Sequence, residues 1–302
     1  MGILISHVHF LAKENENHPI KGKVLTLGQQ GVLATLIDVK KIIESYGTLY
    51  ALKSDFDTKN KIPEWIGTEN EKFTNAQTIF SLLGAEKVYA CDYSDYENPD
   101  FIFDLNYQVG DEYKERFDVI FDSGTLEHIF DISTALNNVD FMLKKGGQLI
   151  IFSPASNMVD HGFYSFSPTL FYDYFKNREY NNFSCYLREA FPFNVNKRGK
   201  TYKYHNVGDQ LPLFSKHSLE VIFFANKGEN NRKDKMKKPI QSLYVFKFSV
   251  DSKAEKHRTI SKFIMKKIYF FVKPIIPSFF TKLIRQIIRK KNIANISYLG
   301  RY

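Results

Sequence analysis

Two histidines, His128 and His161, lie where an imidazole could take a proton from a bound molecule. His128 follows the apolar stretch 117–122, and His161 follows the apolar stretch 147–152. An imidazole changes its protonation state near neutral pH, so it can serve as a base for a hydroxyl group that is about to react. A hydrogen-bonded structural role is the alternative for either histidine, and the sequence leaves both roles open.

Aromatic residues follow His161 and could line a pocket for the molecule that reacts. Phe163, Tyr164 and Phe166 come directly after Gly162 in the sequence. Aromatic side chains are typical of the walls of small-molecule pockets. Packing in the hydrophobic core is the alternative, because aromatic residues also fill protein cores.

A glycine turn and an acidic residue favour a nucleotide-like ligand. The apolar residues 24–27 lead into Gly28, and Asp92 follows the apolar stretch 87–91. In doubly wound folds, a glycine turn after the first strand lets the backbone approach the ligand, and an acidic residue after the second strand accepts hydrogen bonds from ribose hydroxyls. An ordinary turn or helix cap is the alternative for Asp92.

Alternating strands and helices must position these residues. Such alternation predicts an α/β sandwich with a largely parallel sheet. We expect strands near residues 23–28, 87–91, 117–122, 147–152, 217–224 and 240–249, and helices near residues 33–46, 74–84, 132–144 and 168–176. The stretch of about 47–73 is longer than a simple crossover needs, so it predicts an insertion, either a lid or a surface excursion.

The block 117–157 is the most specific signal in the chain. It contains the sequence LEH at residues 126–128 and the sequence LKKGG at residues 143–147. In this order and spacing, the block resembles the second half of class I S-adenosylmethionine-dependent methyltransferases of the methyltransferase type 11 kind. The resemblance extends over about 20–250 and implies a Rossmann-like, doubly wound, mostly parallel seven-stranded sheet that binds S-adenosyl-L-methionine.

The same resemblance implies a set of cofactor-binding residues. Gly28 corresponds to the first glycine of the family's glycine turn, and Asp92 to the acid that binds the ribose. Asp104 corresponds to the acid that meets the adenine amino group. Gln30 and Ser123 are further candidates.

The glycine turn departs from the family's pattern of an acid followed by Gly-x-Gly-x-Gly. Thr26 stands in place of the acid, and Gln30 and Val32 stand in place of glycines. A side chain at these positions lies where the methionine part of the cofactor would bind. The amide of Gln29 or Gln30 could instead offer hydrogen bonds to the amino and carboxylate groups of the cofactor.

The resemblance implies methyl transfer to an oxygen or nitrogen of a small molecule or sugar, in cell-surface glycan or metabolite biosynthesis. His128 or His161 would assist the acceptor, since methyl transfer mainly requires positioning and, for a hydroxyl, a base. A catalytically inactive scaffold protein with the same fold at a membrane surface is the alternative. A nicotinamide-dependent oxidoreductase is disfavoured by the block 117–157.

The positive charge of the protein is concentrated in its last fifty or so residues. Thirteen of the 42 basic residues and two of the 33 acidic residues lie in 251–302, so that this segment carries +11 and residues 1–250 carry −2. We therefore expect a methyltransferase-like domain over 1–250 and a basic amphipathic helical extension over 251–302.

The segment 260–291 is a candidate for binding an anionic membrane surface. Within 278–291, apolar residues form one helical stripe and basic residues cover much of the remaining surface. No apolar run is long enough to span a bilayer, so an in-plane helix on an anionic surface is favoured. Packing on the domain or on a partner subunit is the alternative, and binding to nucleic acid is unlikely on this basis.

The first residues contain no secretory signal, and Cys91 and Cys185 give no disulfide framework. A cytoplasmic protein is the expectation, peripheral at the inner face of the membrane if residues 260–291 bind there. His7 and His9 alternate with apolar residues, which predicts a half-exposed strand. No metal site is predicted, since no third ligand lies near these histidines.

Overall fold

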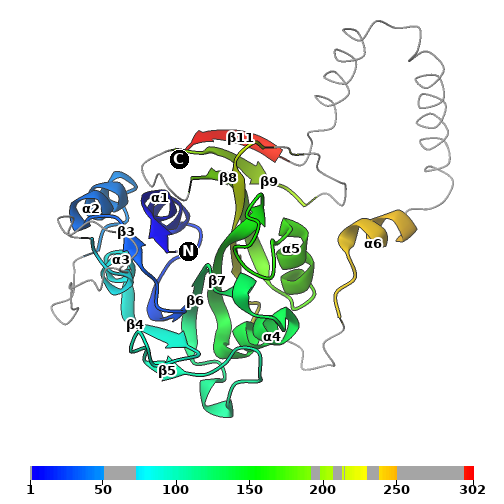
Figure 1. Cartoon of the computed structure of the whole chain (residues 1–302), viewed down its shortest axis with the longest axis horizontal. Coiled ribbons are helices and arrows are strands. Elements are labelled where there is room, and N and C mark those ends of the chain that lie inside the picture. The colour runs from blue at the N-terminus through cyan, green and yellow to red at the C-terminus, as the bar shows by residue number, and fades with distance from the viewer. Residues whose placement is uncertain are drawn as a thin grey trace, which may run out of the picture.

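The computed structural model describes residues 2–50, 73–191, 198–206, 213, 215–229, 238–249 and 296–302. Most of the predicted insertion, 51–72, and most of the predicted extension, 250–295, lie outside the described residues. A large mixed sheet forms the centre of the molecule (Figure 1). Its strands are β2 (Gly22–Leu27), β4 (Ala85–Asp92), β5 (Phe101–Ile102), β6 (Phe117–Ser123), β7 (Leu143–Ser156), β8 (Asn181–Ala190), β9 (Lys200–Tyr204), β10 (Ser218–Asn226) and β11 (Ile296–Arg301).

The strand order of this sheet is β11-β9-β8-β10-β7-β6-β2-β4-β5. The strands from β5 to β7 pair in parallel, whereas β10 runs antiparallel to both of its neighbours, β7 and β8. From β2 the chain moves outward through β4 to β5, and then returns to the other side of β2 to form β6. The order therefore reverses between β2 and β6, and in open α/β sheets ligands bind at the carboxyl ends of the strands at such a point.

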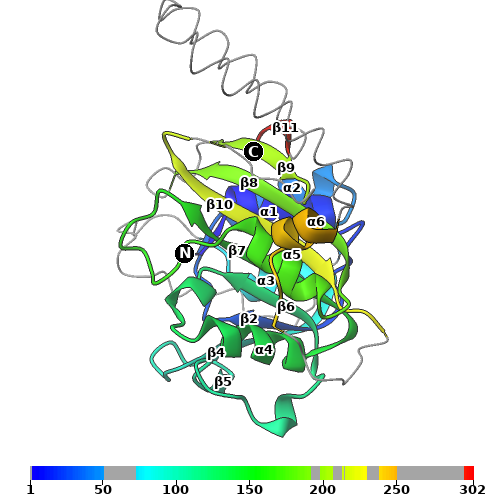
Figure 2. The same cartoon turned by 90° about the vertical axis from the view of Figure 1, so that its right-hand side faces the viewer.

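Helices cover both faces of the sheet (Figures 1 and 2). One face carries α1 (Ile5–Glu14), α2 (Leu36–Ser45) and α3 (Ala76–Leu82), and the other carries α4 (Ile132–Met142) and α5 (Pro168–Lys176). Alternate residues of a strand enter the two resulting cores. In β6, Val119 packs with the first group of helices and Ile120 with the second. This double burial explains why the centre of the strand, Val119–Phe121, is apolar on both faces.

Short elements complete the carboxyl edge of the sheet. A two-residue strand, β1 (Ile3–Leu4), pairs in parallel with β3 (Val32–Leu33) beside the turn that follows β2. The 3₁₀ turn η3 (Leu126–His128) follows β6 at this edge, whereas the 3₁₀ turn η2 (Asp111–Tyr113) comes before the amino end of β6. The turn η3 therefore places the LEH sequence at the point where the strand order reverses.

Local signals set the helix boundaries near the site. The side chain of Asp131 accepts a hydrogen bond from the backbone N–H of Thr134 at the start of α4, and Thr35 accepts one from Asp38 at the start of α2. Such caps pair backbone donors that the helix itself leaves unpaired. The predicted helices near 33–46, 74–84, 132–144 and 168–176 are confirmed in this way or by their packing.

The sheet differs from the prediction in size and in its last strand. The described residues form a nine-stranded sheet rather than a seven-stranded one, because β9 and β11 extend it beyond β8. The predicted strand 240–249 is wrong, since Ser242–Ser249 form the helix α6. A short apolar run does not distinguish helix from strand, and β10 lies between β7 and β8 with no free edge for a further strand beside it.

The amino-terminal and carboxyl-terminal segments also differ from the prediction. His7 and His9 lie on helix α1 rather than on a half-exposed strand, and the His7 ring is buried against Glu220. Within the predicted helical extension, Ile296–Arg301 form β11, which pairs antiparallel with β9 at the sheet edge. In the part of the chain that the structure describes, no helix has the length and apolar character needed to cross a membrane.

Candidate active site at the reversal of strand order

The turn after β2 requires a glycine at position 28. Gly28 has a φ of +73°, and its N–H donates a hydrogen bond to the carbonyl of Cys91 over 2.8 Å. A Cβ atom at this position would lie 2.8 Å from Oγ1 of Thr125. Only glycine combines this backbone conformation with such close packing. The turn therefore brings the ends of β2, β4 and β6 together.

Gln30 folds back onto this turn. Its Nε2 donates to the carbonyl of Leu27 over 2.5 Å, and the hydroxyl of Thr125 donates to the same carbonyl over 2.7 Å. The other amide atom, Gln30 Oε1, is buried and has no hydrogen-bond partner among the described residues. Thr26, in place of the family's acid, donates its hydroxyl to the carbonyl of Gly28. The replaced positions thus stabilise the turn and leave one unpaired acceptor beside it.

Asp92 lies at the end of β4 and faces the same turn. Its Oδ1 accepts the backbone N–H groups of Tyr93 and Ser94, which fixes the carboxylate at the strand end. Its Oδ2 lies 4.0 Å from the position of a Cβ built on Gly28. The structure therefore brings Gly28 and Gln30 of one turn together with Asp92 at the end of another strand.

Asp104 and Ser123 occupy different surroundings. Asp104 follows β5 at the same edge of the sheet, and its Oδ1 accepts both the backbone N–H and the side-chain amide of Asn106, each over 2.8 Å. Ser123 ends β6, is fully buried and donates its hydroxyl to the carbonyl of Gly2 over 3.4 Å. Ser123 therefore anchors the segment that contains β1.

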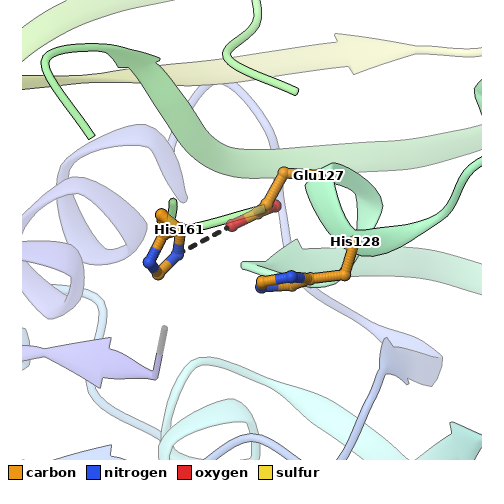
Figure 3. Close-up of side chains that lie close together, drawn as sticks. All are labelled: Glu127, His128 and His161. Carbon is orange, nitrogen blue, oxygen red and sulfur yellow. Dashed lines mark ion pairs between the residues drawn. The ribbon is translucent and has the colours of Figure 1, made fainter. Parts of the chain in front are cut away.

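Glu127, His128 and His161 form a compact cluster beyond β6 and β7 (Figure 3). Glu127 is fully buried, and its Oε1 lies 3.4 Å from Nε2 of His161. The rings of His128 and His161 lie 5.3 Å apart between centroids. The loop that carries His161 is held in place because the Glu127 carbonyl accepts the N–H groups of Phe163 and Tyr164. The two predicted histidines are therefore neighbours, and a buried carboxylate lies beside them.

Further polar groups support the Glu127 carboxylate from behind. The Ser153 hydroxyl of β7 lies 3.3 Å from Glu127 Oε2 and 3.3 Å from Asp122 Oδ2. Asp122 also accepts the N–H groups of Thr125 and Leu126, which shapes the turn into η3. Burial, and then the nearby Glu127 carboxylate, raise the pKa of Asp122 well above its usual range. This shift favours a neutral Asp122 beside the Glu127 carboxyl group.

The environment of His128 favours a neutral imidazole. Its side chain is exposed at the end of η3. Partial burial of the ring lowers the pKa of His128, the Glu127 carboxylate opposes this effect, and His161 adds to it. A neutral imidazole has a nitrogen lone pair that can accept a proton or bind a cation.

The aromatic residues near His161 divide between the surface and the core. The side chains of Phe130 and Phe163 are 70% and 65% exposed, and their rings pack edge to face at 5.6 Å between centroids. The Tyr164 hydroxyl donates to the Phe130 carbonyl, whereas Phe166 is buried in the core. Phe163 and Phe130 thus form an exposed apolar rim beside the histidines, and Phe166 packs as the alternative interpretation expected.

Sequence reasoning assigned no role to Glu127 or Thr125. Both lie within the stretch 123–128 whose sequence marked the site, so the signal was present. What the sequence did not contain was the burial of Glu127, which places its carboxyl group beside two histidines. Cys91 is excluded as a nucleophile, because burial raises the pKa of its thiol to about 12.

Comparison with known proteins gives structural matches alone. No family model matches the chain, and no curated protein sequence matches it. Among solved structures, the chain is similar to the CurJ carbon methyltransferase, with 11% identity and a TM-score of 0.33 over 70% of this chain and 50% of that one. The chain thus spans about half the length of that protein.

Two further matches are also methyltransferases. One is the 1,6-didemethyltoxoflavin-N1-methyltransferase of Burkholderia thailandensis with bound S-adenosylhomocysteine, with 12% identity and a TM-score of 0.33 over 74% of this chain and 78% of that one. The other is an S-adenosylmethionine-dependent methyltransferase of Thermotoga maritima, with 13% identity and a TM-score of 0.34 over 73% and 91%. Identities and TM-scores this low carry no argument about function, so a function for this chain has to be argued from its own residues.

Proposed function

We propose that the chain is an S-adenosylmethionine-dependent methyltransferase that acts on an oxygen or nitrogen of a small molecule or sugar. The observation that carries the proposal is the meeting of Gly28 and Asp92 at the reversal of strand order, beside the cluster of Glu127, His128 and His161. A glycine turn and an acid at this point of a doubly wound sheet are suited to an adenosine ligand.

The residues of the turn fit the cofactor. Asp92 and Asp104 would accept hydrogen bonds from its ribose and adenine, and Gly28 would let the backbone turn at the strand end beside Asp92. The buried, unpaired Oε1 of Gln30 would accept a hydrogen bond from its amino group. The cofactor supplies an activated methyl group when bound, so the protein has mainly to orient the acceptor.

The histidine cluster lies where the acceptor would be oriented. His161 faces the Glu127 carboxyl group over 3.4 Å, a contact that would orient the imidazole ring. His128 lies beside it, in an environment that favours the neutral ring. The exposed pair Phe130 and Phe163 offers an apolar contact for the acceptor. A hydroxyl acceptor would lose its proton to one of these histidines.

A second candidate is a binding or scaffold protein without catalytic activity. The observation that favours it is that Gln30 and Ser123 are bonded to the chain itself, to the Leu27 and Gly2 carbonyls. In either case, we propose that residues 260–291 attach the protein to an anionic membrane surface in the cytoplasm, on the evidence of the charge in that segment.

Calorimetric titration with S-adenosylmethionine and S-adenosylhomocysteine tests the proposal. We expect binding to the full chain, and binding at least about tenfold weaker in Asp92→Asn, because a hydrogen bond to a charged group contributes about 1.5–3 kcal/mol. The amide keeps an oxygen for the Tyr93 and Ser94 N–H groups, so the turn is preserved. Asp95→Asn, at an exposed position three residues on, is the matched control.

The two candidate functions give different results in this titration. Folded protein that produces no heat with millimolar ligand overturns the enzyme proposal and favours the scaffold protein. Equal weakening in Asp92→Asn and Asp95→Asn overturns the assignment of Asp92 to the cofactor.

A further inference from the structure

The buried side of the histidine cluster contains two polar atoms that lack hydrogen bonds. Glu127 Oε1 and His161 Nε2 are both shielded from solvent, and neither has a hydrogen-bond partner among the described residues. They face each other over 3.4 Å (Figure 3). A buried carboxylate oxygen that has this ion-pair contact but no hydrogen bond is only partly compensated for its burial. A group that bonds to both atoms at once would remove the remaining cost.

The spacing of these two atoms suits a metal ion between them. Two donors bound at about 2.1 Å to a tetrahedral zinc ion lie about 3.4 Å apart. The third donor is a ring nitrogen of His128, and all three donor atoms lie within 4.8 Å of one another. Because the His128 side chain is exposed, a rotation about its side-chain bonds can bring that nitrogen to bonding distance.

The kinds of donor favour zinc over magnesium or calcium. Two neutral imidazoles and one carboxylate carry a single negative charge, which complements a divalent cation. Imidazole nitrogens suit zinc and neighbouring transition metals, whereas magnesium and calcium prefer oxygen donors throughout. We propose that Glu127, His128 and His161 bind one zinc ion, although the sequence itself predicted no metal site. The proposal does not depend on cofactor binding, and with zinc bound the ring nitrogens that hold the ion would not act as bases for the acceptor.

The surroundings of the three donors resemble the support that metal ligands need. The Ser153 hydroxyl lies 3.3 Å from Glu127 Oε2, so the carboxylate is held at the oxygen that does not face His161. Gly162 packs so closely on the Glu127 carbonyl that a Cβ there would lie 2.8 Å from its oxygen. Both contacts fix the ligands in place, as outer contacts do in metal sites.

Three protein donors leave one tetrahedral position open. Structural zinc sites usually have four protein ligands, whereas zinc sites that bind a reacting molecule have three. The open position lies on the side of the partly exposed His161 and the exposed His128, next to Phe130 and Phe163. An oxygen of a bound small molecule could therefore complete the coordination.

Titration of the full chain with ZnCl₂ after removal of bound metal by a chelator tests the proposal. We expect one zinc ion per chain with micromolar or tighter affinity. Loss of an outer contact alone weakens metal binding about 10–100-fold, so His161→Gln and the double variant His128→Gln/His161→Gln should lose at least 100-fold. These side chains are partly exposed, and circular dichroism should confirm that both variants fold.

Two controls identify the site. His205→Gln removes an exposed histidine outside the cluster and should bind zinc as the unchanged protein does. Replacing zinc with Co²⁺ should give a visible absorption band that the double variant lacks. The proposal is overturned if the folded protein binds zinc with millimolar affinity or not at all. It is equally overturned if the double variant keeps the same stoichiometry and affinity.

Discussion

At the scale of single residues, Gly28 and Gly47 share a backbone conformation but differ in how closely they are packed. Gly28 and Gly47 have nearly the same left-handed φ, +73° and +68°. A Cβ at Gly28 would lie 2.8 Å from the Thr125 hydroxyl oxygen, whereas a Cβ at Gly47 would meet nothing within 4 Å. Alanine variants at the two positions therefore separate the energetic cost of a left-handed backbone from the cost of the close packing where β2 and β6 meet.

We expect Gly47→Ala to lower the free energy of unfolding by roughly 1 kcal/mol, the usual cost of a left-handed alanine. Gly28→Ala should lower it by at least about 1 kcal/mol more, since the added methyl group collides with Thr125. Urea denaturation of both variants measures the difference. Equal losses would mean that the turn relaxes without resistance and that the close packing has no energetic effect.

At the scale of elements, a buried charge network joins α1 to the sheet. Glu220 of β10 contacts His7 of α1 over 3.1 Å and Arg188 of β8 through its other oxygen. All three side chains are buried. Burial alone would raise the pKa of Glu220, but Arg188 and then His7 outweigh it and lower that pKa to about 2. The folded protein therefore favours the charged carboxylate.

This network predicts loss of stability in acid. Because the folded state holds the pKa of Glu220 below its usual 4.5, the unfolded chain binds a proton first as the pH falls. The contribution of Glu220 is complete above about pH 4.5 and is lost between there and about pH 2, on the order of 3 kcal/mol. Burial also lowers the pKa of His7 below 6.5, which adds a loss of the same sign. Urea denaturation across this pH range measures the slope.

The double variant Arg188→Met/Glu220→Leu is the control for the acid sensitivity. Replacing a buried ion pair with apolar residues of similar volume is often close to neutral, whereas removing one partner costs about 3–5 kcal/mol. We expect the double variant to lose less stability at neutral pH than Arg188→Met alone and to show a shallower slope between pH 4.5 and 2. An unchanged slope would assign the acid sensitivity to other groups.

At the scale of the whole molecule, membrane binding by the basic segment before β11 has to be tested without disturbing the folded domain. Ile296–Arg301 pair with β9 at the edge of the sheet, so the chain returns to the domain after residues 250–295. A deletion of everything after residue 250 would therefore remove a strand as well as the basic segment. A sharper test changes charge and leaves β11 in place.

We expect the protein to co-sediment with vesicles that contain anionic phosphatidylserine and not with neutral phosphatidylcholine vesicles. Each basic residue near such a surface contributes about 1 kcal/mol, so neutralising Lys282, Arg285 and Arg289 to Gln should reduce pelleting strongly. Lys40→Gln/Lys41→Gln, on exposed positions of α2, is the control and should pellet as the unchanged protein does. Equal pelleting of both variants would remove the membrane-surface proposal.

The sequence predicted the parts of the fold that depend on local patterns. The strands β2, β4, β6, β7 and β10 lie close to the predicted ranges, because each is an apolar run bounded by turn residues. The strands β8, β9 and β11 were not predicted. They lie on the far side of β10, and β11 pairs with β9 from nearly a hundred residues away, which no local pattern indicates. The predicted strand at His7 and His9 was wrong because burial of His7 depends on a distant partner, Glu220, which lies more than 200 residues away in the sequence.

What the sequence alone determined was the α/β class, the segments that carry Gly28 and Asp92, and the two histidines that lie at the site. These follow from short-range spacing, which local geometry converts into strands and turns. Tertiary structure alone decided that Glu127 is buried beside His161 and that His128 and His161, 33 residues apart in the sequence, are neighbours. It also decided that Ser123 and Gln30 bond to the chain itself. The burial of a side chain and its hydrogen-bond partners depend on which strands and loops pack against it, and no local sequence pattern contains that information.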